Sequence, residues 1–159
     1  MCSTKVSPSV ITSWCNINAI SINTNGIKKN GHPFLQHIIS KYAISCVQDT
    51  RFQDKHHLET FHFHLNSACT NKYFISDLNS QSFHHTHSKV NGVMTIIRAD
   101  FPGFETAMMI DTLIIINRYI VVRVQVNHAP IYIHNVYATV NSSERKLFFD
   151  HLNAYIFET

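Results

Sequence analysis

The 159-residue sequence has little charge, no closely spaced cysteine pair and no long apolar segment. Charged residues make up 14% and hydrophobic residues 45%, which is typical of a globular chain and not of a disordered one. The formal net charge of +3 is too small to indicate nucleic-acid binding by itself. No apolar run approaches the ~20 residues of a membrane-spanning helix, so no membrane association is expected. The length allows one domain of ordinary size.

The cysteine pattern and the N-terminus bear on the cellular environment. None of the four cysteines belongs to a C-x-x-C pair, so the sequence indicates neither a zinc ribbon nor a redox dithiol. The first residues lack the basic-then-apolar order of a signal peptide. We therefore expect an intracellular, reducing environment, for which the nucleus is one candidate, and a buried free thiol at Cys46.

The first third of the chain predicts a strand, a helix and a second strand. Residues 16–23 alternate polar and apolar side chains, the period of a half-buried strand, and Asn25 and Gly26 end it as a turn. Residues 33–42 have the spacing of an amphipathic helix with proline in its first turn. Residues 43–48 predict a second strand, and the two strands of such a βαβ unit are expected to be neighbours.

The rest of the chain predicts helices around an antiparallel meander. A helix capped by Asp54 is expected over residues 54–64, and a short strand over residues 72–76. Four β-rich runs are expected to pair with one another: residues 90–98, 104–117, 119–127 and 131–138. A closing helix with Ser142 as its cap is expected over residues 142–157. This order predicts an α+β domain, with little left to cover one sheet face.

Three side chains are candidates for a site. Residues 44–51, ISCVQDTR, end an apolar strand in the carboxylate of Asp49, although an aspartate after a strand is also usual in a turn. Asn23 precedes a turn and is equally explained by turn chemistry. Tyr137 ends an apolar run, where packing is the alternative explanation.

The stretches around these residues occur in a defined order: SINTNG (21–26), CVQDTR (46–51) and NVYATVN (135–141), with NGVMTI (91–96) in between. Together they resemble the endonuclease/exonuclease/phosphatase family, and within it the AP-endonuclease-like domain of non-LTR retrotransposons. The resemblance covers most of the chain and implies magnesium-dependent cleavage of phosphodiester bonds in DNA.

The resemblance also implies a fold and residue roles. It implies a partial four-layer α/β-sandwich of this family's type over residues 15–159, after a flexible N-terminus at residues 1–14. Asn23 and Tyr137 match active-site residues, and Asp49 matches the family's Mg²⁺-binding glutamate.

The sequence departs from the family pattern in three ways. Asp49 is one methylene shorter than glutamate, so it would hold Mg²⁺ weakly or through water. Thr139 stands where the family has proline, which loosens that corner of the chain. Nothing after Asn141 matches the family's later Gly-Asp-Phe-Asn-like and Ser-Asp-His-like stretches. We therefore expect the N-terminal half of a sandwich that is weakly active or inactive alone and prone to aggregation.

Two other functions stay open. One is a non-catalytic retroelement remnant or nucleic-acid-binding fragment, in which four cations contact the backbone: Lys28, Lys29, Arg51 and Lys55. The other is a histidine-rich metal-binding module, although its spacing matches no closed zinc site. The candidate zinc ligands are His84, His85, His87 and Cys69. The sequence fixes neither the oligomeric state nor the choice among DNA, RNA and small phosphoesters.

Overall fold

The computed structural model describes residues 17–27, 31–52, 55–68, 73–78, 92–115, 117–138 and 141–157. These residues form three α-helices and two β-sheets, which confirms the predicted α+β class. None of the described helices has the length and apolar character needed to cross a membrane. The expected flexible N-terminus, the Asp54 cap, Thr139 and the candidate zinc ligands lie outside the described residues.

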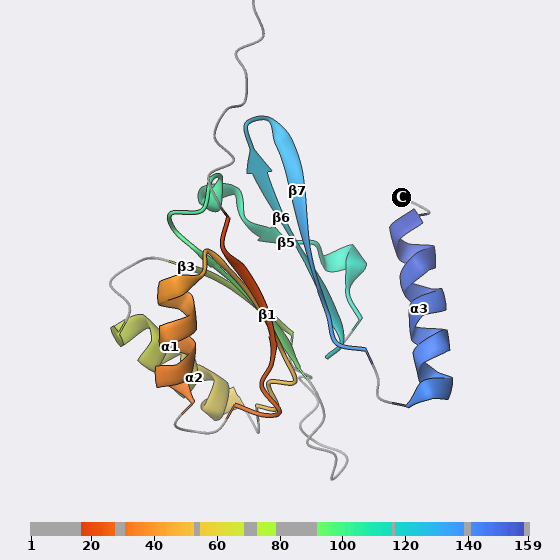
Figure 1. The fold of residues 1–159 in the computed structure, drawn as a ribbon, viewed down its shortest axis with the longest axis horizontal. Coiled ribbons are helices and arrows are strands. Elements are labelled where there is room, and N and C mark those ends of the chain that lie inside the picture. Colours follow the sequence, from red (N-terminus) through yellow and green to blue (C-terminus); the bar gives the residue numbers. More distant parts are fainter. Residues whose placement is uncertain are drawn as a thin grey trace, which may run out of the picture.

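The larger sheet has four strands in the order β1-β2-β4-β3 (Figure 1). In chain order, its strands and their helices are β1 (Ala19–Asn23), α1 (His32–Lys41), β2 (Ile44–Gln48), α2 (Lys55–Ala68), β3 (Tyr73–Leu78) and β4 (Val93–Arg98). β1 and β2 are parallel neighbours, which confirms the predicted βαβ unit. β4 lies antiparallel between β2 and β3. The prediction that residues 90–98 pair with the later strands was therefore wrong.

The smaller sheet has the order β5-β6-β7. Its strands and the closing helix are β5 (Met108–Met109), β6 (Tyr119–Val126), β7 (Ala129–Val136) and α3 (Ser142–Phe157). β6 and β7 form the predicted hairpin, and its turn residues Asn127 and His128 have φ values of 48° and 68°. The predicted continuous strand over residues 104–117 was wrong. Two 3₁₀ turns, Phe104–Thr106 and Asp111–Leu113, interrupt it and leave the short strand β5 and a single bridge between Ile115 and Tyr119.

The elements stack as helices, sheet, sheet and helix (Figure 1). α1 and α2 pack on one face of the larger sheet, where Leu35 and Leu65 are in one cluster with Val47. The other face packs on the smaller sheet, where Ile97 meets Val124. Alternation along each strand places successive side chains in different layers. The core is therefore split between the two faces of the larger sheet.

α3 covers the outer face of the smaller sheet. Leu152 and Phe148 of the helix pack with Tyr119 and Val121 of β6. The expectation that one sheet face lies bare was therefore wrong at these positions. The physical reason is that alternate side chains of β6 point away from the larger sheet and meet the apolar side of α3.

Asn135 on β7 is the polar group that joins the two sheets. Asn135 is only 1% exposed. Its side-chain Nδ2 donates hydrogen bonds to the Met94 carbonyl at 2.9 Å and to Thr95 Oγ1 at 3.2 Å. Its Oδ1 accepts a hydrogen bond from Gln48 Nε2 at 2.7 Å, and the same amide donates to Ser21 Oγ at 3.0 Å. These bonds fix β7 against the larger sheet, because buried polar groups are costly without partners.

Replacing Asn135 by alanine should lower the free energy of unfolding by about 1–3 kcal/mol, because Gln48 and the Met94 carbonyl lose a buried partner. Urea denaturation followed by circular dichroism measures this loss. Asn153→Ala is the matched control, since Asn153 is exposed on α3 and its loss should change stability by less than about 0.5 kcal/mol. Equal effects of the two substitutions would contradict a linking role for Asn135.

Candidate functional site

The C-terminal ends of β1 and β2 form one edge of the larger sheet, where Asn23 is paired in register with Gln48. The segments that follow remain bonded through their backbones. The N–H groups of Thr24 and Gly26 donate to the carbonyls of Gln48 and Asp49 at 2.9 and 2.7 Å. The Thr24 hydroxyl also donates to the Gln48 carbonyl at 3.0 Å. These hydrogen bonds fix the backbone from which the side chains at this edge extend.

This edge also concentrates left-handed backbone conformations. Asn25 and Gly26 have φ values of 50° and 94°, as expected of the turn predicted there. Asp49 and Arg51 have φ values of 57° and 49°, which cost free energy in residues with a Cβ atom. Such strain occurs often at functional sites, so the segment after β2 is a candidate on conformational grounds as well.

Asp49 and Arg51 form a two-bond ion pair. Arg51 Nε donates to Asp49 Oδ1 and Arg51 Nη2 donates to Asp49 Oδ2, both at 2.7 Å. The side chain of Asp49 is 3% exposed and that of Arg51 is 40% exposed, so the guanidinium separates the carboxylate from solvent. The hydrogen bond to Asp49 is the main reason that the pKa of Arg51 is raised, and a hydrogen bond to Tyr137 adds to it.

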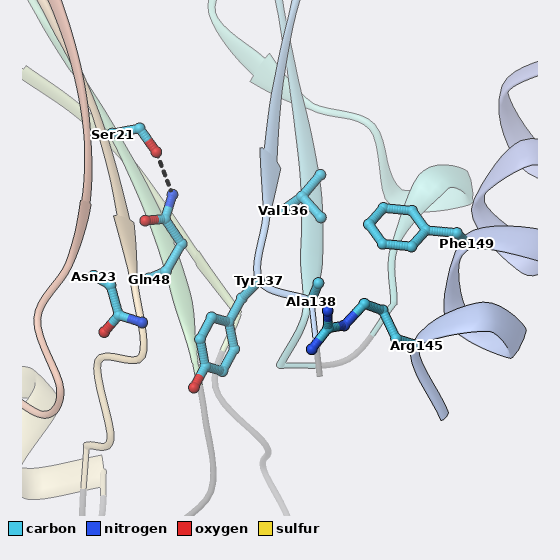
Figure 2. A pocket seen from close by; sticks show the side chains of 8 residues that line it. All are labelled: Ser21, Asn23, Gln48, Val136, Tyr137, Ala138, Arg145 and Phe149. Carbon is cyan, nitrogen blue, oxygen red and sulfur yellow. Dashed lines mark hydrogen bonds between the residues drawn. The ribbon is translucent and has the colours of Figure 1, made fainter. Parts of the chain in front are cut away.

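A pocket of about 560 Å³ opens at this edge, between the two sheets and α3 (Figure 2). Its lining residues are Ser21, Asn23, Gln48, Val136, Tyr137, Ala138, Arg145 and Phe149. Two of the predicted site residues, Asn23 and Tyr137, thus line one pocket although they come from different sheets. Asp49 is not among the lining residues and reaches Tyr137 only through Arg51. Asn23 also shapes its turn, because its Oδ1 accepts the Asn25 N–H at 2.9 Å.

Two arginine side chains lie near Tyr137. Arg51 is close enough for the tyrosine to contribute to its raised pKa, and Arg118 Cζ lies 5.1 Å from the centre of the Tyr137 ring. Arg145 lines the same pocket from the first turn of α3. Because Asp49 pairs with Arg51, the arginines considered for binding a ligand are Arg118 and Arg145.

The start of α3 sets the position of Arg145. Asn141 Oδ1 accepts hydrogen bonds from the Ser143 backbone N–H at 3.1 Å and from Ser143 Oγ at 2.8 Å. The Asn141 carbonyl accepts the Arg145 N–H at 2.9 Å. Asn141 is therefore the N-cap, and the prediction that Ser142 caps this helix was wrong because Ser142 already lies inside the first turn.

Comparison with known proteins leaves the family open. Models of known protein families give no match to the sequence, and curated proteins give none either. The resemblance to the endonuclease/exonuclease/phosphatase family therefore stays a prediction that depends on the residues of the three stretches and on the geometry of the pocket.

The sequence did not indicate Gln48 and Arg145 as pocket residues, nor Asn135 as the partner of Gln48. The available signal for the two amides was a polar side chain at an inward position of an otherwise apolar strand. Gln48 occupies such a position in β2, and Asn135 occupies one in β7. Arg145 gave no local signal, because an arginine near the start of a helix is ordinary at a surface.

The described residues, as arranged, do not fit the Mg²⁺ ion that the resemblance implies. Both oxygens of Asp49 are engaged by Arg51, whereas Mg²⁺ requires near-octahedral oxygen ligands. Within the described part of the chain, no group of three His, Cys, Asp or Glu side chains that could hold a metal ion is found. Of the four predicted rim cations, the structure describes the side chain of Arg51 alone, and that side chain pairs with Asp49.

Gly26 allows the backbone strain at this edge to be measured, and Gly103, which lies against Gln125 near the other end of β6, provides a comparison. An added Cβ at Gly26, whose φ is +94°, would make an ordinary 3.5 Å contact with Arg51 Cδ. Gly26→Ala should therefore cost about 1–3 kcal/mol from backbone strain alone. Gly103 has a φ of +80°, but its added Cβ would lie 2.0 Å from the Gln125 carbonyl oxygen. Gly103→Ala should therefore lower the free energy of unfolding by more than Gly26→Ala does. Equal losses for the two variants in urea denaturation would contradict this expectation.

Proposed function

We propose that this chain is an endonuclease/exonuclease/phosphatase-type domain whose pocket binds a phosphodiester group of a nucleic acid, with DNA as the expected partner. The helix, sheet, sheet and helix layers agree with the four-layer sandwich of that family. Asn23 and Tyr137, which the resemblance assigns to the active site, line one pocket. These two observations come from different parts of the chain and support the same family type.

The observation that carries the proposal is the set of hydrogen-bond donors around the pocket. A phosphodiester presents charged oxygens, which bind best to guanidinium groups and also accept hydrogen bonds from amide and hydroxyl groups. Arg145, Tyr137 and Asn23 supply these three kinds of donor to the same pocket. Arg118 lies over the Tyr137 ring and adds positive charge nearby.

The Asp49–Arg51 pair favours binding over cleavage. As arranged, the Asp49 carboxylate and the Arg51 guanidinium neutralise each other, and both carboxylate oxygens are engaged. The second candidate function is Mg²⁺-dependent cleavage of DNA, which would require Asp49 to exchange Arg51 for the metal. Both oxygens of Asp49 are engaged by Arg51, so we derive no cleavage step from this arrangement.

Arg145→Gln should weaken binding of a fluorescein-labelled DNA oligonucleotide by about tenfold, as expected for one lost charge-assisted hydrogen bond. Fluorescence anisotropy at fixed salt concentration measures the affinity. Lys146→Gln is the matched control, because it removes the same charge from the next residue, which pairs with Asp150 and is not among the pocket residues. Equal losses for both variants would show a general charge effect and contradict a phosphate site in the pocket.

The cleavage alternative has its own test. Wild-type protein and Asp49→Asn, which keeps the side-chain shape, are incubated with plasmid and oligonucleotide DNA in the presence of Mg²⁺. We expect the two proteins to cleave equally little, because Arg51 occupies both carboxylate oxygens. Faster cleavage by the wild type, abolished by EDTA, would contradict this expectation and establish Asp49 as a metal ligand.

A further inference from the structure

The pocket has two chemically different sides. Polar side chains from the larger sheet and from Tyr137 make one side (Figure 2). The other side is made by the apolar side chains of Val136, Ala138 and Phe149 together with the guanidinium of Arg145. Phe149 is 41% exposed although a phenylalanine of a folded domain is usually buried. An exposed ring in a pocket lined with hydrogen-bond donors suggests a ligand that is itself partly apolar and partly charged.

Helix geometry places Phe149 beside the proposed phosphate site. Arg145 and Phe149 are four residues apart on α3, so they lie on the same face about one turn apart. Figure 2 shows both side chains extending from α3 toward Val136 and Ala138 at the end of β7. One helix face therefore presents a guanidinium and an aromatic ring to the same pocket.

The ring of Phe149 contacts the neighbouring ring of Phe148. It meets the ring of Phe148 at a centroid distance of 5.3 Å and an interplanar angle of 76°, an edge-to-face contact. Phe148 in turn packs against the cluster of Tyr119, Val121 and Leu152 under α3. This contact supports the Phe149 ring, and 41% of the residue remains exposed.

We infer that the pocket takes an unpaired nucleotide of single-stranded DNA, with the base stacked on Phe149 and the adjoining phosphate bound by Arg145 and Tyr137. This inference depends on the proposed phosphodiester site and adds the class of substrate. A nucleotide carries its charged phosphate and its flat ring on opposite sides of a sugar, which matches a cation and an aromatic ring one helical turn apart. A base inside a duplex must first leave its stack to reach such a pocket, so paired DNA binds more weakly.

The test compares three labelled ligands by fluorescence anisotropy: an oligothymidylate, an abasic oligodeoxyribose phosphate of equal length, and a duplex of that length. The wild type binds the oligothymidylate most tightly. Phe149→Ala weakens that binding by about 5- to 100-fold and leaves the abasic ligand unchanged, because only a base can stack. Leu147→Ala is the control, since Leu147 is 63% exposed on the same helix but is not among the pocket residues.

Phe149→Trp separates stacking from a structural effect. It keeps an aromatic surface and should retain tight binding of the oligothymidylate, while thermal melting by circular dichroism verifies that each variant folds. Equal weakening of the base-containing and abasic ligands by Phe149→Ala would overturn the stacking role, as would equal wild-type affinity for both ligands.

The two proposals fail in different ways. If Arg145→Gln weakens binding and Phe149→Ala does not, the phosphate site stands and the nucleotide inference is wrong. If neither substitution weakens binding of any ligand, the proposed function and the inference are both wrong. Tighter binding of the duplex than of the single strand would also overturn the inference while leaving the phosphate site intact.

Discussion

The hydrogen bond between Gln48 and Asn135 is the interaction on which the pocket depends. The two amides lie on different sheets, and their 2.7 Å bond fixes where the end of β7 meets the end of β2. Tyr137 follows Asn135 by two residues and enters the pocket from this fixed position. Because Asn135 also bonds to Met94 and Thr95, the link is part of a network with few degrees of freedom.

The Asp49–Arg51 pair is a second constraint, because it determines which groups Asp49 can bind. A carboxylate that is almost fully covered requires a cationic partner, and Arg51 supplies it within two residues of the same segment. The pairing directs the Arg51 guanidinium to Tyr137 and at the same time occupies the oxygens that a metal would need. While this pair is formed, Asp49 is not available to hold a metal that would activate water.

Local patterns predicted much of the fold, and long-range pairing determined the rest. The βαβ unit, the β6–β7 hairpin and α3 follow from periodicity and turn residues within short segments. The sheet to which β4 belongs depends on its partners β2 and β3, which no local pattern specifies. The same holds for the site, since Gln48 and Asn135 are 87 residues apart in the chain. The resemblance predicted Asn23 and Tyr137 as site residues, and both line the pocket. The pairing of Asp49 with Arg51 was not predicted, because it depends on the backbone conformation after β2.

A titration with a short oligothymidylate, followed by NMR in protein labelled with ¹⁵N, tests most directly whether the pocket is a nucleic-acid site. The side-chain amide signals of Asn23 and Gln48 and the backbone signal of Ala138 report from within the pocket. Saturable shifts of these signals, with little change in α1 and α2, are the predicted result. Shifts confined to other surfaces, or no saturable shift at the pocket, would contradict it.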